Sequence, residues 1–309
     1  MKTAIVGAGI CGLYLAWKLS EKGENVTVFE KKEKIGKEVC SGLFSKKILD
    51  FIPESESLVQ NEIDFVLIHF PKKIFKIDFT DKFFVINHAR LDGIIYNLAR
   101  NAGAEILLDH CVGPFPEGFE RIIGCDGAMS QVRKNLGMRD PKFRLAIRGF
   151  LPKKDFSNFV ETWATKAGFI WRIPRGENTE YGIIEEPKIC GAIFEEFLQK
   201  NNISLNDKKS ALVPCGFLVP ENKEITLCGD AAGLTKPWSG GGVIWGLTAA
   251  DALLKNFPNF LKYQRECKKI FRFNFVFSRV ATKIVYFMGF NIRWILPSRF
   301  RIEGDFLKK

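Results

Sequence analysis

The stretch Gly7-Ala8-Gly9-Ile10-Cys11-Gly12 decides the fold of this chain, because it has the spacing G-x-G-x-x-G of a dinucleotide-binding turn. It follows the apolar segment Lys2–Val6, which we expect to be a strand, and precedes residues 13–19, whose composition favours a helix. A second strand is expected at residues 26–29. This strand–helix–strand order is that of a Rossmann unit.

Each glycine of such a turn has a physical role. Gly7 permits the tight turn out of the strand, Gly9 lets the backbone approach a pyrophosphate, and Gly12 lets the helix pack on the sheet. The helix N-terminus offers free N–H groups and a partial positive charge to phosphates. Glu30 comes at the end of the second strand, where its carboxylate can accept both hydroxyls of a ribose.

Two later motifs extend this prediction along the chain. Asp126 follows the apolar segment Arg121–Gly124, and Asp230 follows residues 225–228. Asp230 can accept a hydrogen bond from a ribityl hydroxyl, and the run Gly240-Gly241-Gly242, just before an expected helix at 243–254, can turn backbone N–H groups towards a flavin ring. Either Asp taken alone is equally typical of a turn or a helix cap. The three motifs in this order predict FAD, held along its whole length.

The order of elements predicts an α/β protein with a Rossmann-like FAD-binding domain, an interleaved antiparallel-sheet substrate domain and a C-terminal helical segment. Short strands at 65–68, 74–79 and 83–86, with turns at 71–72 and 80–81, and four more between 145 and 184 indicate the antiparallel sheet. We expect the FAD-binding domain at 1–62, 87–140 and 220–256. The substrate domain is expected at 63–86 and 141–219, and the tail at 257–309.

The amino-acid composition limits the classes of protein to which this chain can belong. The chain has 309 residues, of which 46% are hydrophobic and 26% charged, as is ordinary for a globular protein. Eight cysteines form no C-x-x-C pair, so no metal site is expected. Because Met1 and Lys2 lead directly into the first strand, no signal peptide is expected, and we predict a cytoplasmic protein. No nucleic-acid-binding module accompanies the net charge of +11, so no nucleic-acid partner is expected.

The positive charge is concentrated in the tail. Residues 252–309 contain 13 Lys and Arg against Glu266, Glu303 and Asp305, interleaved with aromatic side chains. The longest uncharged run there, 284–292, is far too short to span a bilayer. Two interpretations stay open: a helical cap with a solvated face, or a peripheral contact with the inner face of the cell membrane.

Two further segments narrow the class of flavoprotein. Glu38-Val39-Cys40-Ser41-Gly42 resembles the cysteine–glycine active-site loop of the geranylgeranyl reductase family. The segment from Phe169 to Gly176 resembles its Y-x-W-x-F-P-x-G substrate motif, with Phe169 and Ile173 in place of Tyr and Phe. With Asn87-His88-Ala89-Arg90-Leu91-Asp92 and the motifs above, the resemblance covers nearly the whole chain. It implies the para-hydroxybenzoate-hydroxylase type of FAD fold.

The resemblance also implies functional residues. Contacts with FAD are implied at Cys11, Glu30, Cys40, Ser41, Arg90, Val112, Asp230, Gly242 and Val243, to which the motifs themselves add Gly7, Gly9, Gly12 and Asp126. Phe169 and Trp171 are implied to line an isoprenoid channel, and Trp238 is a further candidate wall; all three are alternatively core aromatics. The family saturates double bonds of geranylgeranyl chains, in archaea on membrane ether lipids, so a prenylated lipid is the implied substrate.

The proposed chemistry leaves several points open. A prenyl chain has no polar handle, so its binding must come from burial, at about 0.8 kcal/mol per CH₂. Cys40 is the candidate catalytic residue; it can donate the proton or simply fill space beside the ring. A single G-x-G-x-x-G predicts a transient reductant, either NADPH or a small acidic carrier such as ferredoxin. Alternative functions are a flavin monooxygenase of a small hydrophobic substrate and a non-catalytic prenyl-lipid carrier. The sequence predicts no oligomeric state.

Overall fold

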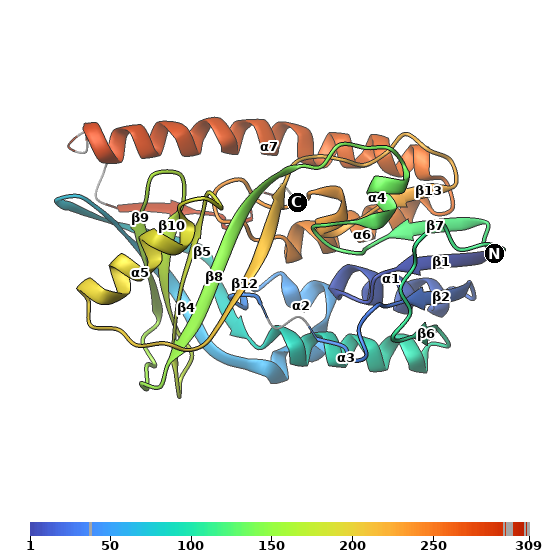
Figure 1. The fold of residues 1–309 in the computed structure, drawn as a ribbon, viewed down its shortest axis with the longest axis horizontal. Helices are drawn as coiled ribbons and strands as arrows, with labels where there is room; N and C mark the ends of the chain where they lie inside the picture. The colour runs from blue at the N-terminus through green and yellow to red at the C-terminus, as the bar shows by residue number, and fades with distance from the viewer. Residues whose placement is uncertain (37–38, 293, 295–298, 306, 308–309) are drawn as a thin grey trace. The chain divides into compact units, whose positions relative to one another are not determined.

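The computed structural model describes residues 1–36, 39–292, 294, 299–305 and 307, and the chain forms two compact units (Figure 1). The first unit comprises Met1–Lys37, His88–Lys142 and Pro214–Phe275. The second comprises Glu38–Asn87, Phe143–Val213 and Val276–Lys309. Residues 39–62 therefore group with the second sheet, and the tail is divided between the units.

The first unit is built on a parallel sheet of five strands in the order β13-β7-β1-β2-β6. The strands are β1 (Lys2–Val6), β2 (Asn25–Phe29), β6 (Glu105–Leu107), β7 (Arg121–Gly124) and β13 (Ile225–Leu227). Ala4 and Ile5 in the central strand are fully buried, because a parallel sheet is covered on both faces. The Rossmann-like fold predicted from the glycine turn is confirmed.

Helices cover this sheet. They are α1 (Ile10–Glu21), α3 (His88–Asn101), α4 (Gln131–Asn135), α6 (Val243–Asn256), the 3₁₀ helix η2 (Gly229–Ala232) and the first half of α7 (Phe260–Asn291). Helix α1 packs against both α3 and α6. Ten of its twelve residues are buried, which explains why its sequence is apolar on nearly every side rather than on one stripe.

The second unit contains a nine-stranded sheet in the order β12-β8-β11-β10-β9-β4-β5-β14, with β3 paired to β5. Its strands are β3 (Leu43–Ser45), β4 (Val59–Phe70), β5 (Lys73–Ile86), β8 (Lys142–Leu151), β9 (Phe159–Ala164), β10 (Phe169–Pro174), β11 (Thr179–Glu185), β12 (Asn206–Cys215) and β14 (Arg299–Ile302). Three helical segments belong to it: α2 (Ile48–Phe51), η1 (Pro53–Leu58) and α5 (Cys190–Lys200). The pairs β4–β9 and β5–β14 are parallel, so the sheet is mixed rather than wholly antiparallel.

The predicted turn at residues 80–81 is wrong, because β5 runs without a break through Thr80 and Asp81. The partners of β5 change at this point instead. Its residues 76–79 pair with β14, residues 83–85 pair with β3, and β4 shifts register between Ile63 and Phe65. Strands β12 and β14 were not expected, since their charged residues hide the apolar alternation. The helical tail is confirmed by α7.

Candidate functional site

Five strands of the first unit end at residues singled out from the sequence. Strand β1 leads into the glycine turn, β2 into Glu30, β6 into the segment containing Val112, β7 into Asp126 and β13 into Asp230. Because all five strands are parallel, these segments lie along one edge of the sheet. Doubly wound sheets bind their ligands at this carboxyl edge.

The glycine turn is tightly packed on one side and open on the other. Gly7 has a φ of +102°, and a Cβ there would lie 2.5 Å from the carbonyl oxygen of Cys125. A Cβ on Gly12 would lie 2.0 Å from the carbonyl oxygen of Gly7. In the part of the chain that the structure describes, a Cβ on Gly9 would meet no atom within 4 Å, and no side chain caps α1. Open space before an uncapped helix N-terminus fits the pyrophosphate of a dinucleotide.

The carboxylate of Glu30 is held against this turn. Its Oε2 accepts a hydrogen bond from the N–H of Ala8 at 2.8 Å, and its Oε1 accepts one from the N–H of Lys32 at 3.0 Å. The carbonyl oxygen of Glu30 accepts the N–H of His110 at 2.8 Å, which anchors the segment leading to half-buried Val112. Two acceptor sites of the carboxylate are left for ribose hydroxyls, since a carboxylate can accept about four hydrogen bonds.

Asp126 has a structural role at the start of α4. Its Oδ2 accepts the N–H groups of Gln131 at 2.6 Å and Val132 at 3.1 Å, which is the capping role that the sequence left open as an alternative. Its Oδ1 is buried and accepts no hydrogen bond from the part of the chain that the structure describes. A buried carboxylate oxygen without a donor is compatible with a hydroxyl donor from a ligand.

Arg133 is a fully buried residue to which the sequence gave no role, although its place after Asp126 was the available signal. Its guanidinium donates to the carbonyl oxygens of Ala128 at 2.8 Å and Ala231 at 2.9 Å, and its Nε donates to Asp140 at 3.1 Å. Arg133 therefore fastens the loop after β7 to the loop after β13. Both loops carry candidate cofactor residues.

The last motif gathers at the N-terminus of α6. Gly242 is its N-cap and Val243 its first residue, and Oδ1 of Asp230 lies 2.8 Å from the place that a Cβ on Gly242 would take. A side chain at Gly242 would thus displace the Asp230 carboxylate. Trp238, in the loop before α6, makes an edge-to-face contact with Trp245, with ring centroids 6.0 Å apart.

Cys11 and Arg90 have different surroundings. The Cys11 sulfur lies only 2.7 Å from the Cβ position of Gly229 and 2.6 Å from that of Gly246, so it fills the contact between α1 and α6. A cofactor contact by Cys11 would therefore use its backbone. Arg90 is exposed in the first turn of α3, where its guanidinium is accessible to phosphate groups.

In the second unit, the loop of Cys40, Ser41 and Gly42 is held in a defined conformation; Glu38 lies outside the described residues. Cys40 is half-buried, and its Sγ accepts the N–H of Gly42 at 3.4 Å. Gly42 has a φ of +63°, and its carbonyl oxygen accepts the N–H of Ile86 at 2.8 Å. The carbonyl oxygen of Ser41 accepts a hydrogen bond from the guanidinium of Arg175.

Trp171 lies in the core of the second unit, within an apolar cluster that includes Ile63 and Val85. Its indole N–H donates to Oε1 of Glu180 at 2.9 Å, and a Cβ on Gly182 would lie 2.2 Å from its six-membered ring. The alternative of a core aromatic thus describes most of its surface. Phe169 is half-buried beside it, with ring centroids 6.1 Å apart, whereas Trp238 belongs to the first unit.

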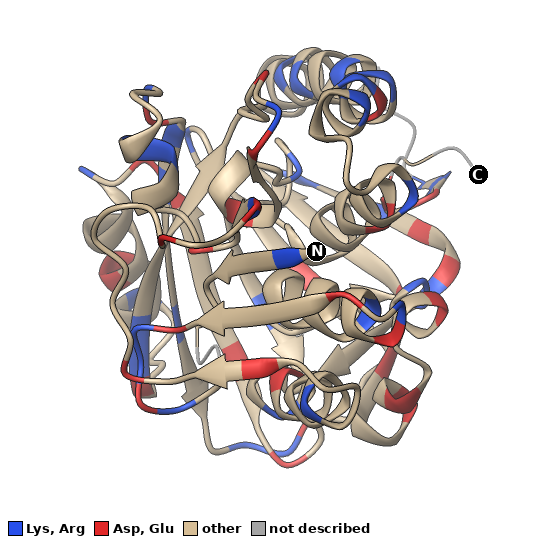
Figure 2. Cartoon of the chain, turned by 90° about the vertical axis from the view of Figure 1, so that its right-hand side faces the viewer, with Lys and Arg blue, Asp and Glu red and all other residues tan. Residues whose placement is uncertain are grey.

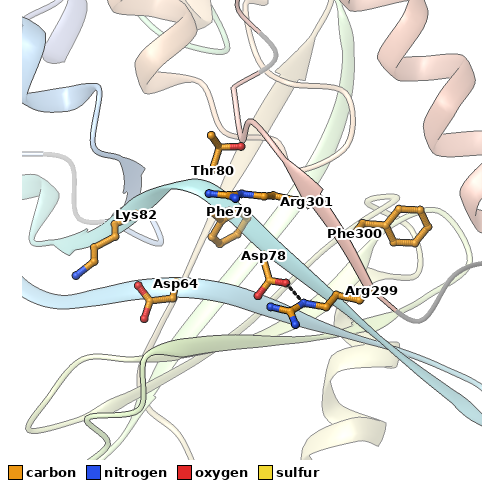
Figure 3. Close-up of a pocket in the computed structure, with 8 residues that line it drawn as sticks. All are labelled: Asp64, Asp78, Phe79, Thr80, Lys82, Arg299, Phe300 and Arg301. Carbon is orange, nitrogen blue, oxygen red and sulfur yellow. Dashed lines mark hydrogen bonds and ion pairs between the residues drawn. The ribbon is translucent and has the colours of Figure 1, made fainter.

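A hollow of about 640 Å³ in the second unit lies between β4, β5 and β14 (Figure 3). It is lined by Asp64, Asp78, Phe79, Thr80, Lys82, Arg299, Phe300 and Arg301. Asp78 pairs with Arg299, and Lys82 pairs with Glu62, so much of the charge that lines the hollow is already compensated. None of the candidate site residues is among the described residues that line this hollow.

Comparisons with known proteins agree with this arrangement. A family model described as an NAD(P)-binding Rossmann-like domain matches residues 5–42. The chain is 26% identical to digeranylgeranylglycerophospholipid reductase 2 of Methanopyrus kandleri, over 91% of this chain and 85% of the relative. A geranylgeranyl bacteriochlorophyll reductase-like protein from Thermoplasma acidophilum superposes with a TM-score of 0.81 at 19% identity, over 91% of this chain and 86% of that one.

A probable FAD-dependent monooxygenase from Pseudomonas aeruginosa shares the fold at a TM-score of 0.69 and 14% identity, over 94% of this chain and 95% of that one. Because several chemistries use this architecture, the fold alone does not select among them. The fold predicted from the motifs is that of the FAD-dependent oxidoreductases, and the resemblance to the geranylgeranyl reductases is confirmed by both the sequence relative and the solved structure.

Proposed function

We propose that this protein is an FAD-dependent reductase that saturates C=C bonds of geranylgeranyl chains in membrane ether lipids or their precursors. The observation that carries the proposal is the series of acidic and glycine residues that follow five parallel strands at one sheet edge, in a chain similar over 91% of its length to a digeranylgeranylglycerophospholipid reductase. The residues at that edge fit a long dinucleotide rather than a small anion. Bound FAD would supply a hydride to the alkene.

The chain itself has to hold the cofactor, bind the prenyl chain and supply a proton. Glu30, Asp230 and the amides after Gly9 hold FAD, and half-buried Phe169 contributes apolar surface for the prenyl chain. We assign the proton to the thiol of Cys40, whose Sγ is already oriented by the N–H of Gly42. The alternative, that Cys40 only fills space, predicts that a small apolar residue would serve as well.

The test of the function is anaerobic. The purified flavoprotein is photoreduced, mixed with a geranylgeranyl lipid, and the lipid is analysed by mass spectrometry. Reductase activity gives reoxidation of the flavin and a gain of two mass units per saturated bond. A protein that binds the lipid without reoxidation of the flavin is a carrier, and a gain of 16 mass units in a parallel reaction exposed to oxygen would identify a monooxygenase; either result overturns the proposal.

Substitution of Cys40 by Ala tests the assignment of the proton. We expect Cys40→Ala to retain FAD and the prenyl lipid but to lose alkene reduction by at least about a hundredfold, the usual contribution of a general acid. Wild-type turnover in Cys40→Ala would remove the thiol from the mechanism. Supply of electrons by NADPH or by reduced ferredoxin is distinguished in the same assay, by which of the two supports turnover.

A contact with an anionic lipid bilayer is proposed for α7. In the second unit its residues Val276, Phe277, Val280, Ile284 and Phe287 recur every three or four positions, and all five are exposed. Between residues 267 and 291 the helix has five Lys or Arg and no acid (Figure 2). An exposed apolar stripe beside cations suits an interfacial helix on anionic headgroups. Among the described residues, no helix combines the length and hydropathy needed to cross a bilayer.

Vesicle flotation tests the membrane contact. The chain should float with phosphatidylglycerol vesicles and less with phosphatidylcholine vesicles, and added salt should release it, because each cation contributes up to about 1 kcal/mol near an anionic surface. The variant Phe277→Ser with Ile284→Ser should lose binding. Phe156→Ser, which removes an equally exposed Phe off the helix, is the matched control. Flotation that is indifferent to lipid charge and to the helix variant would contradict the contact.

A further inference from the structure

One buried ion pair in the second unit joins the cysteine loop to the aromatic strand. Glu180, on β11, is fully buried and accepts three N–H donors: the indole of Trp171 at 2.9 Å and the Nε and Nη2 of Arg175, at 2.8 Å and 2.7 Å. The same guanidinium donates to the carbonyl oxygen of Ser41 and to Gln60 at 2.9 Å. A single guanidinium thus reaches both the carboxylate and the loop.

Removing two charged groups from water costs free energy, so stability alone does not account for this buried ion pair. Burial raises the pKa of the Glu180 carboxyl, and the neighbouring Arg175, the indole of Trp171 and Arg148 oppose that rise. Buried ion pairs are often no more stabilising than apolar residues of similar size, but they fix geometry. Glu180 holds the guanidinium of Arg175 in one orientation, and in that orientation an N–H group of Arg175 donates to the Ser41 carbonyl oxygen.

Two hydrogen bonds hold the C-terminal side of the loop. Gly42 adopts a left-handed conformation and pairs with Ile86, and its N–H is taken by the Cys40 sulfur. These bonds define the C-terminal side of the loop. The bond from Arg175 to Ser41 ties the middle of the loop to the end of the strand that carries Trp171.

We propose that Arg175, oriented by Glu180, is the positioning residue that sets the Cys40–Gly42 loop relative to Trp171. The proposal rests on the proposed function for its catalytic meaning, but its structural part does not. Loss of the Glu180 charge frees Arg175 to rotate, so the Ser41 carbonyl loses its donor while Trp171 keeps an acceptor. The loop then samples other conformations, and the Cys40 thiol is no longer held in place.

The test compares Glu180→Gln with Glu161→Gln in the full-length, FAD-loaded protein. Glu161 also pairs with an arginine of β10, Arg172, at 2.7 Å, but that pair does not reach the cysteine loop. The first measurement is amide hydrogen exchange of the peptide covering residues 39–44. We expect Glu180→Gln to speed exchange there about tenfold, as the loss of a charge-assisted hydrogen bond would, and Glu161→Gln to leave it unchanged.

The second measurement is steady-state turnover of the prenyl lipid. A positioning role predicts that Glu180→Gln lowers kcat about tenfold or more with little change in KM, while Glu161→Gln has wild-type kinetics. Should Glu180→Gln fail to fold, Arg175→Lys serves in its place, because lysine keeps the charge but lacks the fork that reaches both partners. Unchanged exchange in a folded variant overturns the proposal, whereas faster exchange without any lipid turnover in the wild type would contradict only the proposed function.

Discussion

The two units present their candidate residues in different ways. In the first unit, the glycine turn, Glu30, Asp126 and Asp230 each follow a strand of one parallel sheet by a few positions, so spacing along the chain places them. In the second unit, the contacts that shape the candidate loop join distant residues; Ser41 and Arg175 are 134 positions apart. Local sequence can predict which residues lie at the carboxyl edge of a parallel sheet, because each of them directly follows a strand. The position of a loop on a mixed sheet cannot be predicted in this way, because it depends on which strands become neighbours.

The largest expected effect concerns a place where the first unit also depends on a distant contact, between Arg133 and Ala231. Arg133→Gln removes the guanidinium donor from the buried carbonyl oxygen of Ala231, at about 1–3 kcal/mol, and from the partly buried carbonyl oxygen of Ala128. We expect a loss of several kcal/mol in unfolding free energy and loss of bound FAD. Denaturant unfolding and flavin absorbance measure both.

The control for Arg133 is Lys134→Gln, on the same short helix but exposed. It should change neither stability nor flavin content. If Arg133→Gln retained FAD with wild-type stability, the loops after β7 and β13 would be fixed by local sequence alone. The contrast between a locally determined first unit and a second unit that depends on distant contacts would then be larger.

A smaller effect is expected in the second unit from Gly182→Ala. The added Cβ would come within 2.2 Å of the Trp171 ring on the neighbouring strand, and overpacking of this kind costs about 1–3 kcal/mol. Displacement of the indole should also change the Trp fluorescence. Gly191→Ala, whose Cβ meets nothing within 4 Å at the start of α5, should be neutral or stabilising. Equal stability of the two variants would argue that Trp171 packs elsewhere.

The smallest effect is a pH dependence at the second half of α7. The Tyr286 hydroxyl donates to the carbonyl oxygen of Gly168 at 2.7 Å, and burial raises its pKa to about 12. The folded state therefore keeps this proton at pH values where the unfolded chain, with a tyrosine pKa of about 10, has lost it. The contribution of Tyr286 is complete below pH 10 and falls by up to about 1.4 kcal/mol per pH unit as the pH rises towards 12.

Denaturant unfolding of wild type and Tyr286→Phe at pH 9 and pH 11 measures this contribution. Near pH 9 the variant should be less stable by about 1 kcal/mol, the value of one hydrogen bond. The difference should shrink or change sign at pH 11. A difference that stays constant between the two pH values would show that Tyr286 does not retain its proton in the folded chain.

The sequence predicts the first unit better than the second, for the same physical reason. The glycine turn, Glu30 and Asp230 were placed correctly on strand ends because a Rossmann unit repeats one local order. The role of Arg133 was missed because its two carbonyl partners come from separate loops. In the second unit the early strands were recognised by composition. The unbroken β5 was not, because residues 299–302 and 43–45 supply its partners.

The candidate site shows the same limit at the level of side chains. A Trp–x–x–Pro pattern drew attention to Trp171, but nothing near it in the sequence predicts that Glu180 accepts its N–H. Strand β11 carries two acids, Glu180 and Glu185, and both are buried. The sequence did not reveal this, because alternation alone does not say which face of a strand is covered. Whether Phe169 and Trp171 contact a prenyl chain stays a proposal.

The central claim is that the cofactor lies at the carboxyl edge of the parallel sheet, with its pyrophosphate in the space before Gly9. The most direct test is the FAD affinity of Gly9→Ala, by fluorescence titration of the cofactor-free protein. Its Cβ meets no atom of the described residues within 4 Å, so folding and melting temperature should be unchanged, as for the control Gly93→Ala. Against a bound pyrophosphate, the same methyl group should cost about 1–3 kcal/mol, or roughly fivefold to 150-fold in Kd. Wild-type affinity in a normally folded Gly9→Ala variant would contradict the account.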